Sequence, residues 1–206
     1  MTIVEDRPLS GNQAGPAELA RRAMIESQLR PTGVNAEFVL RRMAAVERER
    51  FVPKEVRGFA YIDRAIDLGD GRQLAAPIVQ GLMLQEAKPT PDDNALLVDG
   101  GSGYLAELLR PLVGSLAVIS PEQAVTKSRK SEEHTLLLID GAIEQLPEGL
   151  VRRMAEGGRV VTGMLDDGLT RLAIGRKAAG QVTLLPLAEL GMPALPEFAA
   201  PKRWSF

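Results

Sequence analysis

Cysteine is absent from this chain of 206 residues, and His134 is its only histidine. Without cysteine there can be no disulfide framework, no thiolate nucleophile and no cysteine-ligated metal. A zinc site would need mainly carboxylate ligands, which is unusual, so we predict no metal centre. His134 follows Glu132 and Glu133, and we interpret it as part of a solvated charged turn rather than as a catalytic base.

The chain also lacks a strong net charge and a long apolar run. Its formal charge of −2 gives no electrostatic basis for binding nucleic acid or an anionic membrane surface, and the basic cluster at residues 127–130 is too small to change this. No apolar run approaches the ~20 residues of a membrane-spanning helix, and residues 1–16 lack the features of a signal peptide. We therefore expect a flexible tail over residues 1–16, no nucleic-acid or membrane partner, and a cytoplasmic location.

Short apolar runs alternate with helix-like segments over much of the chain. The composition, 45% hydrophobic and 25% charged, is typical of a globular protein. Alternation of this kind predicts a doubly wound α/β sheet. The predicted strands are residues 95–98, 116–119, 135–139 and 159–164, and the predicted connecting helices are residues 104–110, 121–130 and 147–155.

The amino-terminal part of the chain differs from this alternation. Residues 17–64 carry apolar side chains at helical spacing and are predicted to form a helical layer. Asn35 is the expected N-cap of the second helix of that layer. Residues 77–88 fit a further helix with proline in its first turn.

The carboxyl-terminal part differs too. Residues 170–176 and 181–187 flank a short turn, which predicts an antiparallel hairpin, and the proline-rich residues 186–201 are expected to run over the surface. Trp204 and Phe206 are expected to pack on the domain or on a second subunit, so a homodimer is one of two expectations. Residues 17–206 are expected to form one domain, with the sheet and a C-terminal extension in residues 65–206.

A glycine-rich turn follows the first predicted strand. The apolar run that begins at Ala95 stops at Asp99, and Gly100, Gly101 and Gly103 come next, before the helix-like segment that begins at Tyr104. This order is typical of a buried strand, a tight turn and a helix N-terminus. Glycine permits positive φ and close approach of a ligand, and free N–H groups can bind polar or anionic groups. The alternative is an ordinary strand-to-helix turn.

Motifs spread over about residues 20–165 occur in the order found in one enzyme family. Its loop Gly-x-Gly-Gln-Thr-Ile-Ser-x-Pro falls on residues 69–77, its Gly-Ser-Gly-Tyr turn on residues 101–104 and its Gly-Gly-Arg-Val-Val strand start on residues 157–161. Its early motifs have these counterparts: Gln28-Leu29, Gly33-Val34, Val39-Leu40, Met43, Val46, Phe51-Val52-Pro53 and Ala60-Tyr61-Ile62-Asp63. On these residues the chain resembles the protein-L-isoaspartate O-methyltransferase family.

The resemblance implies a fold, an activity and a cofactor. The fold is a Rossmann-like methyltransferase sheet, mostly parallel, with a C-terminal antiparallel hairpin and an N-terminal helical layer. The activity is methyl transfer from S-adenosylmethionine to isoaspartyl carboxylates of damaged proteins, so the partner is a protein or peptide substrate. Such an in-line transfer relies mainly on positioning of the two reactants. The residues implied in cofactor binding are Leu74, Asp99, Gly100, Gly101, Ser102, Gly103, Ser120 and Glu122.

Several positions depart from the family pattern. The serine of the loop motif, implied at the junction of cofactor and substrate, is Ala75, which has no hydroxyl to orient a carboxylate. The acidic residue before the glycine turn is Leu97, and the first glycine of that turn is Asp99. The carboxylate that would bind the cofactor ribose is expected near Ser120, where Glu122 can substitute if the turn is reshaped.

The interval between Ile119 and Thr135 is shorter than in the family. It leaves room for one helix, whereas the family usually has a further edge strand and an adenine-binding Gly-Asp-Gly loop here. Losing an edge strand leaves the ladders of the central strands intact but removes one wall of the adenine pocket. Asp140-Gly141 could stand in for that loop. These departures keep a second function open: a catalytically inactive methyltransferase-fold protein that acts in binding or interaction.

Overall fold

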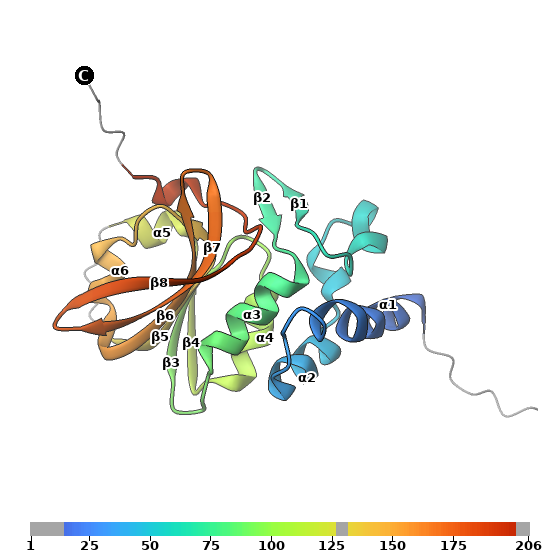
Figure 1. The fold of residues 1–206 in the computed structure, drawn as a ribbon, viewed down its shortest axis with the longest axis horizontal. Helices are drawn as coiled ribbons and strands as arrows, with labels where there is room; N and C mark the ends of the chain where they lie inside the picture. The colour runs from blue at the N-terminus through green and yellow to red at the C-terminus, as the bar shows by residue number, and fades with distance from the viewer. Residues whose placement is uncertain (1–14, 127–131, 201–206) are drawn as a thin grey trace, which may run out of the picture.

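A computed structural model describes residues 15–126 and 132–200 of the chain (Figure 1). Six strands form one sheet in the order β4-β3-β5-β6-β7-β8. Its first four strands, which are parallel, are β3 (Asn94–Val98), β4 (Ser115–Ile119), β5 (His134–Ile143) and β6 (Met154–Asp166). Antiparallel β7 (Leu169–Ala178) and β8 (Gln181–Glu189) complete it. The predicted mostly parallel α/β sheet with its C-terminal hairpin is thus confirmed.

Alternate side chains of the central strand β3 enter two different cores. Ala95 and Leu97 belong to a large apolar cluster with α3 (Pro77–Ala87) and α4 (Tyr104–Leu109). Leu96 and Val98 belong to a second cluster with α5 (Pro121–Val125) and α6 (Glu148–Arg152). Because successive side chains of a strand point to opposite faces, a continuous apolar run is the pattern expected for a strand covered on both sides.

The N-terminal residues form the predicted helical layer against the α3 side of the sheet (Figure 1). It consists of α1 (Pro16–Met24), the π-helical turn η1 (Ile25–Leu29), α2 (Glu37–Ala45) and the 3₁₀ turns η2 (Arg48–Phe51) and η3 (Lys54–Phe59). The expected cap of α2 is wrong. Gln85 Oε1, from α3, accepts the N–H groups of Asn35 (2.9 Å) and Ala36 (3.0 Å), so a tertiary contact rather than a side-chain cap fixes the two residues before this helix.

The connections around the sheet are short. A two-stranded hairpin of β1 (Ile66–Gly69) and β2 (Arg72–Leu74) precedes α3, and the 3₁₀ turn η4 (Arg110–Leu112) follows α4. The helix predicted over residues 147–155 ends earlier, because β6 already begins at Met154. The basic cluster at residues 127–130, and the tail over residues 1–16 apart from its last two residues, lie outside the described residues.

The segment after β8 does not run over the surface as the sequence predicts. Met192, Leu195 and Phe198 are buried, the last in the 3₁₀ turn η5 (Pro196–Phe198). Ala194 forms a parallel bridge with Ala142 of β5, where Ala142 donates its N–H to Pro193 O (2.7 Å). The prediction is wrong because the prolines alternate with apolar residues that cover the end of β5. Trp204 and Phe206 lie outside the described residues.

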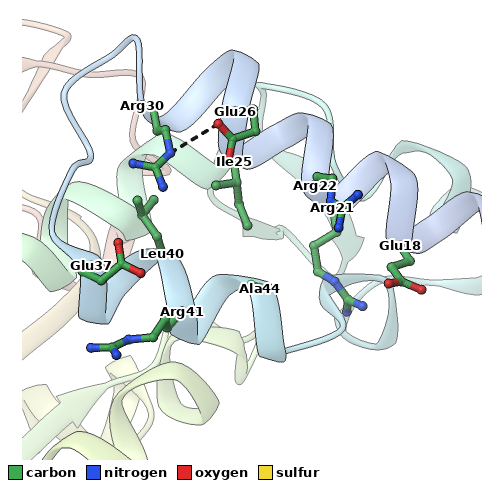
Figure 2. A pocket seen from close by; sticks show the side chains of 10 residues that line it. All are labelled: Glu18, Arg21, Arg22, Ile25, Glu26, Arg30, Glu37, Leu40, Arg41 and Ala44. Atoms are coloured by element: carbon green, nitrogen blue, oxygen red, sulfur yellow. Dashed lines mark ion pairs between the residues drawn. The ribbon is translucent and has the colours of Figure 1, made fainter. Parts of the chain in front are cut away.

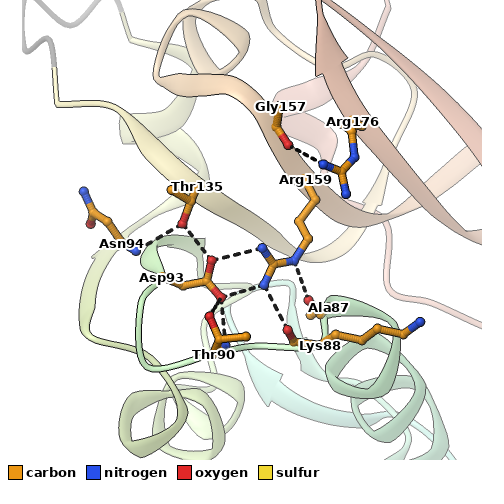
Figure 3. A network of polar contacts seen from close by, with 9 residues as sticks. All are labelled: Ala87, Lys88, Thr90, Asp93, Asn94, Thr135, Gly157, Arg159 and Arg176. Atoms are coloured by element: carbon orange, nitrogen blue, oxygen red, sulfur yellow. Dashed lines mark hydrogen bonds and ion pairs between the residues drawn. The ribbon is translucent and has the colours of Figure 1, made fainter.

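An ion pair joins the sheet to the loop that precedes β3 (Figure 3). Arg159 Nη2 lies 2.6 Å from Asp93 Oδ2 and also donates to Lys88 O (2.9 Å), while its Nε donates to Ala87 O (2.8 Å). Burial raises the pKa of Asp93, but hydrogen bonds from Arg159, Thr135 and Thr90 outweigh it and lower the pKa to about 2. This cluster therefore fixes the amino ends of the parallel strands, opposite the glycine turn.

His134 does not lie in a solvated turn as the sequence predicts. It begins β5, only 1% exposed, with its Nδ1 3.2 Å from Asn94 Oδ1. Burial, followed by the charge of Arg153, lowers its pKa. The two glutamates before His134 suggest a solvent-exposed position, whereas the pairing of β5 with its neighbouring strands buries this residue.

In the described part of the chain, no helix combines the length and the apolar character needed to cross a membrane.

Candidate active site at the glycine turn

The glycine turn lies at the carboxyl end of β3, between β4 and β5. Gly101 and Gly103 have φ of +109° and +72°, values that favour glycine. Gly100 has a different reason: a Cβ there would lie 2.3 Å from the carbonyl oxygen of Asp140 in β5. The turn therefore needs glycine both for its backbone angles and for its contact with the neighbouring strand.

The carboxylate of Asp99 folds back onto this turn. It accepts the N–H of Gly101 (3.0 Å) and that of Gly103 (3.0 Å). Burial raises the pKa of Asp99, against these two hydrogen bonds and the charge of Arg72. Ser102 Oγ accepts the N–H of Tyr104 (3.2 Å). Three of the N–H groups that the sequence suggested for a ligand, those of Gly101, Gly103 and Tyr104, are thus used by the turn's own side chains.

Arg72, at the start of β2, lies across the same turn. A Cβ placed on Gly101 would be 3.0 Å from Arg72 Cγ, so the aliphatic part of this arginine fills the space that Gly101 leaves free. Its guanidinium pairs with Glu197 of η5, Nη2 to Oε1 at 2.6 Å, and with Glu122 of α5. The hydrogen bond with Glu197 is the main reason that the pKa of Arg72 is raised.

Two small cavities border Arg72. One, of about 270 Å³, is lined by Arg72, Asp99, Gly101, Val118, Ile119, Ser120, Pro121, Glu122 and Gln123. The other, of about 200 Å³, is lined by Gly71, Arg72, Gln73, Gly100, Pro193, Ala194 and Leu195. Ligand pockets usually measure about 300–1,000 Å³, so each cavity alone is small for a nucleoside cofactor.

The structure brings some predicted site residues together and leaves others apart. Asp99, Gly101, Ser120 and Glu122 line the larger of these cavities, and Gly100 lines the smaller. Ser120 caps α5, its Oγ accepting the N–H of Gln123 (3.3 Å). Other predicted positions, all buried and in neither lining, are Leu74, Ala75 and Leu97.

A buried polar network lies behind the turn. Arg48 is fully buried and donates to Ala60 O (2.8 Å), to Gln80 Oε1 (2.7 Å) and to the carbonyl oxygen of Ala75. Gln80 Nε2 in turn donates to Asp140 Oδ2 (3.1 Å). Burial and the charge of Asp99 raise the pKa of Asp140 to about 7, although Gln80 and Arg48 act to lower it.

Asp140-Gly141, suggested as a stand-in for the adenine loop, lies inside β5 rather than in a loop. A Cβ on Gly141 would lie 2.6 Å from Leu195 Cγ, so the C-terminal segment covers this position. No pattern in the sequence predicts a role for Arg48, Gln80 or Glu197 in this site. Arg72 could have been noticed, because it is an arginine at the position where the family's loop motif has glutamine.

A further cavity of about 320 Å³ lies between α1 and α2, away from the glycine turn (Figure 2). Its lining is mainly charged and of both signs, with Arg30 paired to Glu26 at 3.4 Å. The charged lining residues are Glu18, Arg21, Arg22, Glu26, Arg30, Glu37 and Arg41. The mixed signs favour a solvated surface between two amphipathic helices.

The chain is similar to one family of known proteins. The model of the protein-L-isoaspartate(D-aspartate) O-methyltransferases matches residues 20–136. A relative named protein-L-isoaspartate O-methyltransferase from Aeropyrum pernix is 37% identical over 177 residues, covering 72% of this chain and 68% of the relative. One of the same name from Pelotomaculum thermopropionicum is 27% identical over 191 residues, covering 81% and 82%.

A solved structure shows the same fold. It is described as a protein-L-isoaspartate O-methyltransferase of Plasmodium falciparum in complex with S-adenosyl-L-homocysteine. It superposes with a TM-score of 0.71 at 18% identity and covers 89% of this chain and 100% of that chain. At this identity the likeness carries the fold and no further property.

The alignments also bear on the short middle of the chain. The one with the Pelotomaculum relative runs over 191 residues yet takes in only 81% of these 206 residues, so part of the relative has no counterpart here. The sequence places this shortage between Ile119 and Thr135, next to β4, which among the residues that the structure describes pairs with β3 alone. With the family match over more than half of its residues, the chain belongs to the protein-L-isoaspartate(D-aspartate) O-methyltransferase family.

Proposed function

We propose that the chain is an S-adenosylmethionine-dependent methyltransferase that acts on isoaspartyl carboxylates of damaged proteins or peptides. The observation that carries this proposal is the position of the glycine turn. It follows β3, from which the chain passes first to β4 on one side and then to β5 on the other. Open α/β sheets bind their ligands outside the carboxyl ends of the strands at such a switch point.

The cofactor would supply the methyl group, and this chain would supply positions. With the side chain of Arg72 displaced from the turn, residues 100–103 would lie against the cofactor. Glu122, at the start of α5, would offer its carboxylate to the ribose hydroxyls. Gly101 of the turn and Glu122 line the cavity of about 270 Å³, and Gly100 lines the cavity of about 200 Å³.

In the conformation described here, the residues do not fit the cofactor. The stem of Arg72 takes the space beside Gly101, and its guanidinium takes the carboxylate of Glu122. Leu97, at the family's acidic position, is fully buried in the apolar core.

These features favour a second candidate function, a catalytically inactive methyltransferase-fold protein that acts in binding or interaction. The specific observation is that Ala75 offers no hydroxyl and lies in the core, 3% exposed. In this candidate the glycine turn and its polar network serve the fold alone.

Transfer of labelled methyl groups from S-adenosylmethionine to an isoaspartyl peptide separates the two candidates. We expect base-labile label in that peptide and none in its aspartyl counterpart. The turnover should fall below the usual enzyme range of about 1–10³ s⁻¹, because the hydroxyl of the family serine is missing. No label above the enzyme-free control, from a folded sample, would contradict the methyltransferase proposal and leave the binding protein.

Three further parts of the proposal concern context. We propose a cytoplasmic location, in which damaged proteins are the substrates, and one domain over residues 17–206. A homodimer through the C-terminal aromatic residues is the third part, and sedimentation of the full chain beside a version lacking residues 201–206 tests it.

A further inference from the structure

We propose that Arg72 is a built-in occupant of the cofactor cleft, held there by Glu122 and Glu197, and that the cleft admits the cofactor only when this side chain leaves. This inference rests on the proposed function for the identity of the ligand. Its physical basis is the position of one side chain, which borders both cavities of the glycine turn.

Arg72 divides what would otherwise be a continuous space. The larger cavity includes Gly101 and the smaller includes the adjacent Gly100, and Arg72 is the residue that lines both. Its Cγ lies 3.0 Å from the point where a Cβ of Gly101 would be, so the side chain lies directly on the turn. Removing it would join volumes of about 270 and 200 Å³, which together reach the usual size of a ligand pocket, about 300–1,000 Å³.

The charges around Arg72 explain why it stays in place. Its guanidinium donates with Nη2 to Glu197 Oε1 at 2.6 Å and with Nη1 to Glu197 Oε2 at 3.4 Å, in addition to its pair with Glu122. The side chains of Arg72 and Glu197 are 22% and 18% exposed, so solvent screens this pair less than a fully exposed one. An arginine paired through both terminal nitrogens is also geometrically well defined.

The same contacts join three segments that are far apart in the sequence. They are β2, the start of α5 and η5, which lie at one end of the sheet in Figure 1. The C-terminal segment has its own anchors, the Ala142–Ala194 bridge and the buried Phe198. The β1–β2 hairpin has only two short strands, and such a hairpin is marginally stable by itself. Ile66 and Leu74 hold the two ends of the hairpin in the core, whereas residues 67–73 are exposed or half-buried. The tip of the hairpin, rather than the C-terminal segment, therefore moves when the cleft opens.

The test compares binding of S-adenosylhomocysteine to the wild type and to Arg72→Ala by calorimetric titration. We expect the dissociation constant to fall about tenfold in the variant, as when the binding-competent form makes up about a tenth of the wild-type molecules. Glu197→Gln should act in the same direction with a smaller effect. Arg152→Ala, which removes an exposed arginine–glutamate pair on α6, is the matched control and should bind as the wild type does.

Hydrogen exchange of the same proteins without ligand separates this inference from the proposed function. We expect faster exchange in the peptide that covers β2 in Arg72→Ala and, to a smaller extent, in Glu197→Gln, but not in Arg152→Ala. That result would show that the ion pairs of Arg72 hold β2 in place. Unchanged exchange in Arg72→Ala, or equal affinity of the wild type and Arg72→Ala for S-adenosylhomocysteine, would overturn the inference about Arg72. As long as that affinity is measurable, the proposed function would stand. Faster exchange with no binding by either protein would leave Arg72 as a contact that holds β2, but it would overturn the proposed cofactor and, with it, the control of cofactor access.

Discussion

Replacing Arg48 with methionine is expected to lower the free energy of unfolding by about 3–5 kcal/mol, because each of the three buried acceptors left without a donor costs about 1–3 kcal/mol. Arg48 has no exposed surface. Without it, Gln80 Oε1 and two backbone carbonyl oxygens lose their donor, and Asp140 loses the nearby positive charge. Its guanidinium carbon also lies 4.8 Å from the ring centroid of Tyr104, a contact that methionine replaces only in part.

Denaturant unfolding followed by circular dichroism measures this loss. The matched control is Arg50→Met, because Arg50 belongs to the same 3₁₀ turn and is exposed, and it should change stability by less than about 0.5 kcal/mol. Arg48→Lys, which keeps the charge but not the planar set of donors, should lie between the two. A loss below about 1 kcal/mol in Arg48→Met would show that the network contributes little, since a single ordinary hydrogen bond is worth that much.

The second large effect is a pH-dependent gain of stability in Asp140→Asn. The pKa of Asp140 is raised from 3.8 to about 7 in the folded protein. An acid with a raised folded-state pKa contributes stability below its unfolded pKa, and this contribution disappears as pH rises through the folded value. Wild-type stability should therefore decline between about pH 4 and 7 relative to the variant. Above pH 7, Asp140→Asn should be more stable by about 2–4 kcal/mol, since each pKa unit corresponds to about 1.4 kcal/mol.

Unfolding free energies at pH 5, 6, 7 and 8 test this expectation. Asparagine keeps the shape of the carboxyl group and an oxygen for the hydrogen bond from Gln80. The control is Asp92→Asn, at an exposed position, which should follow the wild type at every pH. Parallel pH profiles of the wild type and Asp140→Asn would contradict the assigned environment of Asp140.

The sheet could be predicted because its signal is local. A strand buried on both faces must be apolar along its whole length, as residues 95–98 and 136–139 are. The predictions that are wrong concern residues whose position depends on a contact with a distant part of the chain. Asn35 was expected to cap α2, but a glutamine from α3 accepts the N–H groups instead. His134 was expected in solvent, but strand pairing buries it, and the C-terminal segment is held by a bridge to β5.

The candidate site divides in the same way. Its location follows from the turn at Asp99–Gly103, because glycines after a buried strand permit a tight turn with positive φ, which other residues rarely adopt. That Arg72 occupies this site cannot be predicted from the sequence, because Arg72 and its partner Glu197 are 125 positions apart and no local pattern relates them. The network of Arg48, Gln80 and Asp140 likewise joins three elements, so no spacing in the sequence reveals it.

We propose above that the glycine turn is a cofactor site which the chain's own Arg72 occupies. An experimental structure of Arg72→Ala, grown with S-adenosylhomocysteine at a concentration that saturates it in solution, tests this most directly. We predict ligand density against residues 100–103, passing through the space between the two present cavities, with Glu122 within hydrogen-bonding distance of the ribose. Ligand density at another place would overturn this proposal. So would a glycine turn without ligand in which the side chains of Glu122 and Glu197 keep their present positions.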